Sequence, residues 1–409
     1  MVFAILKRRM GWISLLLPLV LSPMVCHSRE GTSEFKAIRA MIGKNDSILV
    51  ETAAGSPLLS INADKKRTPA SILKIFTSLL AFHYLGEDYR FPTHFYLDSE
   101  RNLLVKGFGD PQLVSESLST IAAELMGHER FQSPFIRDIV IDDTFFKQPI
   151  EIPGIEKNDY NPYNSPNGAL SVNFNTVFFK KDGEGRCVSA EPQTPLLPFV
   201  IGRIKAAPFS HERIILSSET HENALYAGHL LQYFLEKEGI RREGTIRTGA
   251  LNPNEAAHIH TWLSPAPVRE SVRQLLYYSN NFMTNQLLIA VGAKVHGAPG
   301  DLDKGLRAAR RFSRDHLKLT AFDIAEGSGI SRKNQVTAAT MMKILRAFEP
   351  HRSLLKTEGC EAFKTGSLSG VSTRAGFITR PDGKRIAFVI MMNTPGKSAE
   401  AVVKKLKLW

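Results

Sequence analysis

Apolar stretches with strand character lie near both ends of the chain. Residues 47–61 hold two short apolar runs on either side of an Ala-Gly-Ser turn, a pattern that predicts a β-hairpin. Near the C-terminus, the runs AFKTGSL, STRAGFITR and KRIAFVIMMN predict three more strands, the last two joined by the turn Pro381-Asp382-Gly383. Two strands early and three late predict one antiparallel sheet that both ends of the chain build together.

Apolar residues at three- and four-residue spacing predict helices beside this sheet. One helix is expected over residues 68–82, TPASILKIFTSLLAF, with Thr68 as its N-cap and Pro69 at its first position. Further helical patterns cover residues 268–293 and 337–348. The hairpin and these helices would pack together as one unit.

The middle of the chain has a different pattern of apolar and polar residues. It mixes short strands such as IRDIVIDDTFF, loops rich in Pro, Asn and Gly, and one apparent helix at residues 222–240. We therefore predict a composite domain made of residues 29–88 and 268–409, and an accessory insert made of residues 89–267. A length of 409 residues suits two or three domains.

Residues 1–28 have the pattern of a secretory signal. Three cations at positions 7–9 precede a mostly apolar run at residues 10–26, and polar sequence follows. The run is short for a membrane-spanning helix and Pro18 interrupts it, so we expect cleavage near residues 26–28. The mature protein is then exported to the periplasm or cell envelope.

The composition is that of a folded globular protein, with 43% hydrophobic and 22% charged residues. Removing residues 1–26, which contain three cations and no anion, lowers the net charge from +12 to +9. A basic exported protein is attracted to anionic surfaces, which favours peripheral association with the envelope. Nucleic acid is not an expected partner, because no basic run interleaved with aromatic residues and no nucleic-acid motif occurs.

No cofactor or metal is expected. HExxH, Walker and Rossmann patterns are absent, and no third ligand accompanies His258 and His260, which would share one face of a strand. Cys187 and Cys360 remain after signal cleavage and could pair in an oxidising compartment, but spacing cannot show whether they meet.

The pattern S-x-x-K occurs at Ser33, Ser71 and Ser353. We expect only Ser71 to lie at the start of a helix and to be followed along the chain by two further motifs. Ser33 lies near the mature N-terminus, and Ser353 lies in a short polar connection. Backbone N–H groups in a first turn lack helical partners, and Lys74 lies one turn along. A lysine desolvated by apolar walls can take the proton of a serine hydroxyl. Taken alone, the pair equally fits a capped helix with a snorkelling lysine.

Two further motifs follow in the chain. YYSNNF contains Ser279 and Asn281 as an S-x-N between two helical segments, a pattern that also recurs elsewhere. AFKTGSL contains K-T-G at residues 364–366 on a predicted strand. S-x-x-K, S-x-N and K-T-G in this order are the signature of serine acyltransferases that react with penicillin.

With these motifs the chain resembles D-alanyl-D-alanine carboxypeptidases/endopeptidases of the penicillin-binding protein 4 family. FGDPQL, VIDDTFF, EGSGISRKNQVTAATMM and KTGSLSGVSTRAGFIT resemble segments of that family in its order, so the likeness covers most of residues 35–395. The long gap between Ser71 and Ser279 is also similar, because that family inserts extra domains there, whereas a class A β-lactamase has a far shorter gap.

The resemblance implies an α/β (α+β) fold of the penicillin-binding/β-lactamase-like transpeptidase type. Its parts would be an antiparallel five-stranded sheet flanked by helices, a helical subdomain, and a β-rich domain inserted between S-x-x-K and S-x-N.

The resemblance also implies roles for the motif residues. Ser71 would be the acylated nucleophile, Lys74 its general base, and Ser279 a relay of the proton to the leaving amine. The implied substrate-binding residues are Asn281 for the substrate amide, Lys364 for positive charge, Thr365 and Ser367 as hydroxyl partners beside Gly366, and the N–H groups of Ser71 and Ser367 as an oxyanion hole. Asn280 stands where many relatives have Asp, which is not a required acid.

The implied activity is cleavage of D-Ala-D-Ala bonds in peptidoglycan stem peptides, or of the cross-link between them, with β-lactam antibiotics as covalent inhibitors. A β-lactamase or esterase on the same fold, and a non-catalytic basic envelope-binding protein, are the alternatives. The oligomeric state is not predicted.

Other polar residues receive structural interpretations. Residues 107–110 are expected to form a turn, and Asp142 and Asp143 to end a strand. Arg374 is predicted to be an exposed strand cation, in preference to a ligand of a substrate carboxylate.

Overall fold

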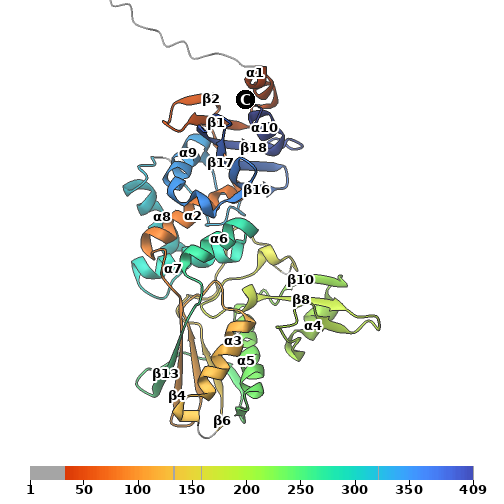
Figure 1. Cartoon of the computed structure of the whole chain (residues 1–409). Coiled ribbons are helices and arrows are strands. Elements are labelled where there is room, and N and C mark those ends of the chain that lie inside the picture. Colours follow the sequence, from red (N-terminus) through yellow and green to blue (C-terminus); the bar gives the residue numbers. More distant parts are fainter. Residues whose placement is uncertain (1–32, 132–133, 158, 321, 409) are drawn as a thin grey trace, which may run out of the picture.

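The structure is a computed structural model that describes residues 33–131, 134–157, 159–320 and 322–408. The expected signal segment lies outside these residues. Within the described part of the chain, no helix combines the length and the apolar character needed to cross a membrane. Figure 1 shows an elongated molecule, with both ends of the described chain in the upper part and the middle of the chain below.

The upper part is built on a six-stranded antiparallel sheet in the order β15-β16-β17-β18-β1-β2. Its strands are β1 (Ser47–Thr52), β2 (Pro57–Ile61), β15 (Lys356–Glu358), β16 (Glu361–Leu368), β17 (Val371–Thr379) and β18 (Arg385–Met392). β1 pairs with β18, which confirms that both ends of the chain build one sheet. The five expected strands are all present, and the short β15 adds a sixth at the edge.

Helices cover both faces of this sheet. β18 alternates strictly, so that Phe388 and Ile390 face one hydrophobic cluster while Val389 and Met391 face another. The first cluster is closed by α1 (Ser33–Met41) and α10 (Ala399–Leu406). The second contains α2 (Lys74–Tyr84), α6 (Val268–Tyr278), α7 (Asn281–His296), α8 (Leu302–Asp315) and α9 (Ala338–Ala347). The sheet is therefore buried on both sides.

The insert has its own hydrophobic cluster and two larger sheets. The five-stranded sheet has the order β12-β7-β5-β4-β13 and consists of β4 (Pro92–Asp98), β5 (Leu103–Gly107), β7 (Ile139–Asp142), β12 (Ile246–Thr248) and β13 (Ala256–Leu263). The long helices α3 (Ser115–Met126) and α5 (Thr220–Lys237) run beside it (Figure 1). A three-stranded sheet projects to one side with α4 (Pro198–Ala206); its strands are β8 (Thr176–Lys181), β9 (Cys187–Ser189) and β10 (His211–Ile215).

Short elements complete the chain. Two small ladders pair β3 (Lys66–Arg67) with β14 (Val336–Thr337), and β6 (Phe135–Ile136) with β11 (Arg241–Arg242). The 3₁₀ turns are η1 (Ala70–Leu73), η2 (Glu129–Phe131), η3 (Pro162–Asn164), η4 (Asn173–Asn175) and η5 (Glu349–Leu354).

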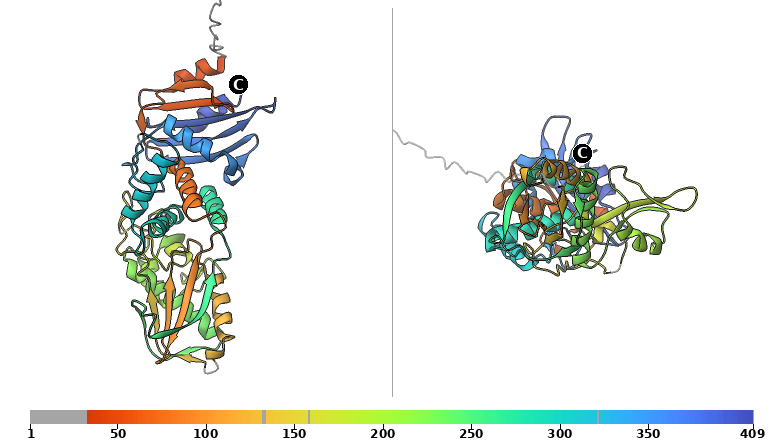
Figure 2. Two further views of the ribbon diagram at one scale, coloured as in Figure 1. Left: turned by 90° about the vertical axis from the view of Figure 1, so that its left-hand side faces the viewer. Right: turned by 90° about the horizontal axis from the view of Figure 1, so that it is seen from below.

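Two chain segments join the insert to the composite domain. The N–H of Ser264 donates to the carbonyl of Phe91 at 2.9 Å, and the N–H of Val268 donates to the carbonyl of Tyr89 at 2.9 Å. The entering and leaving chains thus run side by side, and Figure 2 shows the insert extending away from the sheet below this junction. The insert also contributes to the hydrophobic cluster of the composite domain through Phe91, Phe146, Ile152 and Ala169, so boundaries near residues 89 and 267 stay a prediction.

Candidate active site

Ser71 lies in the 3₁₀ turn η1, directly before α2. The expected N-cap is wrong: the hydroxyl of Thr68 accepts a hydrogen bond from Gln335 at 3.0 Å and caps nothing in this turn. Ala70 adopts a left-handed conformation with φ of 47°. The start of the helix is therefore shaped by its neighbours in the fold and not by a local cap.

Two glycines approach this turn closely. A Cβ atom placed on Gly366 would lie 2.6 Å from the backbone nitrogen of Ser71, and one on Gly329 would lie 2.0 Å from the carbonyl oxygen of Ala70. The hydroxyl of Thr373 donates to the carbonyl of Pro69 at 2.7 Å. The backbone of Ser71 is thus held between β16 and the loop around Gly329.

Lys74 is completely buried next to Ser71. Its Nζ lies 3.0 Å from Oγ of Ser71 and donates to Oδ1 of Asn281 and to the carbonyl of Ser328, both at 2.7 Å. Burial lowers the pKa of Lys74 well below its ordinary value, and the charge of Lys364 lowers it further, while Glu326 opposes the shift. A neutral lysine is therefore accessible beside the serine hydroxyl.

Glu326 is a buried carboxylate that the sequence interpretation did not single out. Its oxygens accept hydrogen bonds from the N–H groups of Ser328 and Gly329, and from the side chains of Asn285 and Asn334. These bonds fix the loop whose carbonyl at Ser328 binds Lys74. The segment EGSGISRKN resembles the family, but no local pattern in it indicates this role for Glu326.

Ser279 occupies the bend between α6 and α7, with a left-handed φ of 57°. The next residue, Asn280, caps α7 through its side chain, which accepts from the N–H of Met283 at 2.9 Å. Nζ of Lys364, on β16, donates to Oγ of Ser279 at 2.9 Å and to the carbonyl of Thr365 at 2.7 Å. Burial lowers the pKa of Lys364 to about 8. The S-x-N and K-T-G motifs therefore meet directly.

The part of β16 that carries K-T-G has a free edge. β15 pairs with β16 only from Glu361 to Phe363, so the backbone from Lys364 onward is unpaired on that side. Thr365 and Ser367 are exposed on this stretch, and Gly366 is buried against η1. An unpaired strand edge beside a nucleophile can bind an extended peptide by main-chain hydrogen bonds.

A cleft of about 730 Å³ opens in front of these groups. Ser71, Ser279, Asn281 and Ser367 line it, and so does the loop 330–333. The insert supplies the opposite wall, which consists of Gly154, Glu156, Tyr163 and Asn164.

The carbonyl of Tyr163 also accepts a hydrogen bond from Nδ2 of Asn281 at 3.2 Å. The insert was predicted only as an accessory part, so its contribution to the site was missed. The signal available in the sequence was the segment NDYNPYNSPN, one of the loops rich in Pro, Asn and Gly that are predicted in the insert.

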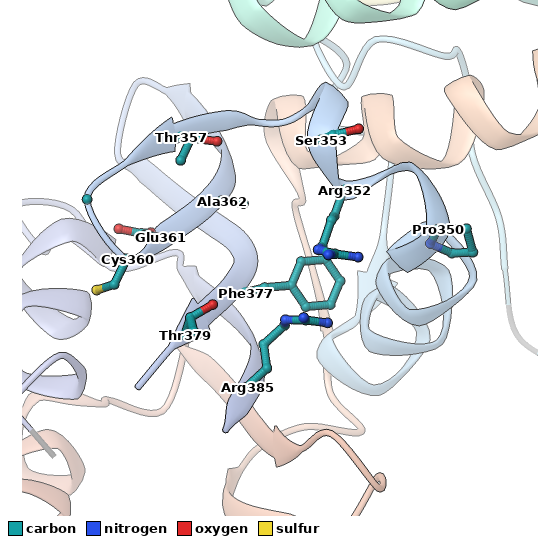
Figure 3. Close-up of a pocket in the computed structure, with 11 residues that line it drawn as sticks. Pro350, Arg352, Ser353, Thr357, Cys360, Glu361, Ala362, Phe377, Thr379 and Arg385 are labelled. Atoms are coloured by element: carbon teal, nitrogen blue, oxygen red, sulfur yellow. The ribbon is translucent and has the colours of Figure 1, made fainter. Parts of the chain in front are cut away.

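The rival S-x-x-K pairs lack this environment. Ser33 does begin a helix, α1, contrary to the expectation, but it is exposed and its hydroxyl donates to Glu34. Ser353 lines a hollow of about 480 Å³ at the far end of the sheet, between η5 and Phe377 (Figure 3). Its lysine, Lys356, pairs with Glu358 at 2.7 Å, and this hydrogen bond raises the pKa of Lys356, the opposite of what a base requires.

The prediction of Arg374 as an exposed cation is wrong. Its side chain is buried, donates to both carboxylate oxygens of Glu361 at 2.7 and 2.8 Å, and lies over the ring of Phe363. Glu361 is itself fully buried and neutralises the arginine. Arg374 therefore serves the packing of the sheet beneath α10.

The expectation that His258 and His260 share a strand face is also wrong. A β-bulge lies between them, so that His258 packs against His94 and Tyr96 while His260 packs against Phe95 on the other face. Among the described residues, no group of three or more His, Cys, Asp or Glu side chains is arranged to hold a metal ion.

The remaining side-chain expectations can be compared directly. Cys187 and Cys360 are free thiols. Asp142 ends β7 as expected, and its carboxylate accepts from Lys106, Thr144 and Leu251.

Comparisons with known proteins agree with the motifs. A model of the D-Ala-D-Ala carboxypeptidase 3 (S13) family matches residues 36–357 and 354–409. The chain is 26% identical over 420 residues to a D-alanyl-D-alanine carboxypeptidase of Actinomadura sp. (strain R39), a match that covers 85% of this chain and 77% of that protein. It is 24% identical over 388 residues to D-alanyl-D-alanine carboxypeptidase DacB of Haemophilus influenzae, covering 79% and 80% of the two chains.

The fold is similar to solved structures. The crystal structure of penicillin binding protein 4 from Haemophilus influenzae superposes with a TM-score of 0.74 at 20% identity, covering 92% of this chain and 98% of that one. A predatory peptidoglycan endopeptidase from Bdellovibrio bacteriovorus superposes with a TM-score of 0.51 at 16% identity, covering 88% and 90% of the two chains. The penicillin-binding fold expected from the motifs is thereby confirmed.

Proposed function

Because the chain belongs to the D-Ala-D-Ala carboxypeptidase 3 (S13) family of serine peptidases, we propose that it cleaves D-Ala-D-Ala bonds, or the cross-links between stem peptides, through an acyl-enzyme on Ser71. The observation that carries this assignment is the position of Lys74. Its Nζ meets two carbonyl-type acceptors, Asn281 Oδ1 and the Ser328 carbonyl, and one hydroxyl, that of Ser71.

These contacts determine where the lone pair of a neutral Lys74 points. A neutral amine has two N–H donors and one lone pair, and the two carbonyl oxygens can only accept. When both N–H groups of neutral Lys74 are donated to them, the lone pair is left facing Oγ of Ser71, which can donate its proton. The burial that lowers the pKa of Lys74 makes this neutral form accessible.

The reaction follows in two steps. Oγ of Ser71 attacks the scissile carbonyl while its proton passes to Lys74, and the negative oxygen is stabilised by N–H groups, for which we propose those of Ser71 and Ser367. The C–N bond then breaks, the proton that Lys74 took from Ser71 passes by way of the hydroxyl of Ser279 to the leaving amine, and the acyl group stays on Ser71. A water molecule then attacks the ester carbonyl and gives a proton to the neutral Lys74, the ester C–O bond breaks, and Oγ of Ser71 takes this proton back as the acid product leaves.

The other motif residues bind the substrate in this proposal. The free edge of β16 pairs with the peptide backbone, with Thr365 and Ser367 as hydroxyl partners. Lys364, held against Ser279, supplies positive charge at the end of the cleft where the terminal carboxylate lies. Asn281 holds Lys74 with its oxygen, and its amide nitrogen faces the insert.

We also propose that the protein works outside the cytoplasm, where stem peptides occur and where β-lactams would acylate Ser71. The basic charge and the signal-like residues 1–28 support this localisation. Fractionation of cells that express the full chain tests it, because a cytoplasmic pool of uncleaved protein would contradict export.

The assignment of the nucleophile is tested with a fluorescent penicillin and peptide mapping. We expect the label on Ser71 and expect Ser71→Ala to abolish it, because no other serine among the described S-x-x-K pairs faces a buried lysine. Ser33→Ala and Ser353→Ala are matched controls that should label normally. Label on Ser33 or Ser353 would show that the nucleophile lies elsewhere.

A further inference from the structure

A second hollow adjoins the cleft on the side of the insert. It has a volume of about 580 Å³ and is lined mainly by residues 149–157. Gly154, Glu156, Asn164 and Lys333 line both hollows. The two spaces are therefore compartments of one groove, and of the two only the first contains Ser71.

The boundary between the compartments is a contact between backbones. Gly154 has a φ of 93°, and a Cβ atom placed on it would lie 2.8 Å from Cα of Ser331 and 3.0 Å from its nitrogen. Ser331 is buried in the loop that Glu326 organises. The insert thus touches the composite domain at a point where no side chain fits, and Gly154 borders both hollows there.

The second compartment combines an apolar lining with charges of both signs. Ile150, Ile152 and Ile155 contribute aliphatic surface. Glu151 and Lys157 pair with each other at 2.7 Å, whereas Glu156 and Lys333, at the border with the cleft, form no ion pair among the described residues. Such a lining suits a peptide that carries aliphatic side chains together with ammonium and carboxylate groups.

We propose that this second compartment binds the part of a cross-linked stem-peptide dimer that lies beyond the reacting bond. The inference rests on the proposed function and deepens it. The cleft alone can hold a terminal D-Ala-D-Ala peptide, because its volume of about 730 Å³ lies within the range of pockets that hold a whole drug-sized ligand. A dimer carries a second peptide in addition to the one that reacts, and the adjoining hollow offers about 580 Å³ for it. Endopeptidase activity then depends on the insert in a way that carboxypeptidase activity does not.

The test fills the second compartment without touching the first. Ile150 is half-buried and lines only the second compartment, so Ile150→Trp should obstruct it. Glu219→Trp approaches the same space from an exposed position and serves as a second variant if the first fails to fold. Ile201→Trp, a half-buried isoleucine on α4 away from the groove, is the matched control.

Three readouts are compared: kcat/KM on a purified cross-linked muropeptide dimer, kcat/KM on a short diacylated tripeptide ending in D-Ala-D-Ala, and the rate of acylation by penicillin. We expect the filling variants to lower kcat/KM on the dimer roughly tenfold or more, the scale of a lost pocket contact, with the other two readouts unchanged. The control should match the unmodified protein in all three.

Each other outcome overturns the inference. An equal fall on the dimer and the tripeptide, or no fall on the dimer, would show that the second compartment does not bind the distal peptide. If the unmodified protein cleaves the tripeptide but not the dimer, the inference fails while the proposed carboxypeptidase function stands. If it cleaves neither, the proposed function fails as well.

Discussion

At the scale of single residues, the site depends on two buried lysines with different partners. Lys74 meets two carbonyl oxygens and the hydroxyl of Ser71, whereas Lys364 meets the hydroxyl of Ser279 and its neighbour's carbonyl. Burial lowers the pKa of both, and for Lys74 the charge of Lys364 adds to the effect. In the proposed mechanism, Lys74 accepts a proton while Lys364 keeps its charge.

These roles predict different outcomes for the same substitution. Lys74→Arg should lower acylation by ~10⁴-fold or more, since arginine cannot lose a proton at working pH. Lys364→Arg keeps the positive charge and should retain partial activity, with the larger loss on peptides that have a free C-terminal carboxylate. Rates of acylation by a penicillin and by a D-Ala-D-Ala peptide make the comparison. Near-normal acylation by Lys74→Arg would mean that the proton acceptor is another group.

The dependence on pH has a definite sign. The acylation rate should rise with pH as Lys74 becomes neutral, and should fall again near pH 8 as Lys364 loses its charge. In Lys364→Arg the alkaline fall should disappear from that range while the rising limb remains. A rate profile for both proteins from about pH 5 to about pH 10 measures this, and an unchanged alkaline limb would show that Lys364 does not control it.

At the scale of elements, the contact between β16 and η1 joins the two ends of the chain at the nucleophile. Gly366 provides the space for it, because a Cβ there would stand 2.6 Å from the nitrogen of Ser71 and 2.4 Å from Oγ1 of Thr373. That nitrogen is a proposed oxyanion donor, so the strand and the turn must meet at one exact distance for the donor to point correctly.

We therefore expect Gly366→Ala to lower penicillin acylation by roughly 100-fold, the cost of a displacement of about 1 Å in a reacting geometry. The matched control is Gly202→Ala on α4, where an added Cβ would meet nothing within 4 Å. Stopped-flow acylation and a circular dichroism spectrum are measured together. A variant that keeps its fold and acylates at the normal rate would show that this contact does not position the donor.

The difference between local and distant contacts explains which elements the sequence could predict. The continuous apolar run of β18 and the three- and four-residue apolar spacing of α9 predicted these elements, because their burial follows from the local sequence alone. The 3₁₀ turn at Ser71 was not, because Gly366 and Gly329 impose it from positions far along the chain. The bulge in β13 and the burial of Arg374 escaped prediction for the same reason.

The residues of the candidate site also fall into those that a local pattern predicted and those that only tertiary contacts bring to the site. The three motifs predicted the residues that lie together around Ser71, since each motif marks its own short segment. Glu326 and Tyr163 were missed, because each acts through tertiary contacts that no local pattern records.

At the scale of the whole molecule, polar contacts hold the insert against the composite domain. Residues 110–112 of the insert touch both connecting segments. Gln112 accepts a hydrogen bond from the hydroxyl of Ser271 on α6 at 2.7 Å, and Asp110 lies beside Ser264 and Tyr89. The turn lies later than predicted: Gly107 is the last residue of β5, and the turn falls at residues 111–112, where Asp110 accepts from the N–H of Gln112 at 2.8 Å. The junction therefore encloses a carboxyl group.

Burial raises the pKa of Asp110 from its ordinary value of 3.8 to about 6, and the hydrogen bond from the N–H of Gln112, together with the nearby hydroxyl of Ser264, opposes the shift. Because the folded state holds this proton more tightly than the unfolded chain does, stability should fall as pH rises from about 4 to about 6 and stay constant above. The difference in the free energy of unfolding corresponds to roughly 3 kcal/mol.

Asp110→Asn removes the titration, so its free energy of unfolding should exceed that of the unmodified protein by a margin that is small near pH 4 and largest at pH 7. Urea unfolding across this range measures the margin, with the exposed Asp303→Asn as control. A margin that does not change with pH would show that the carboxyl group at the junction is not desolvated, and that water reaches the contact between insert and composite domain.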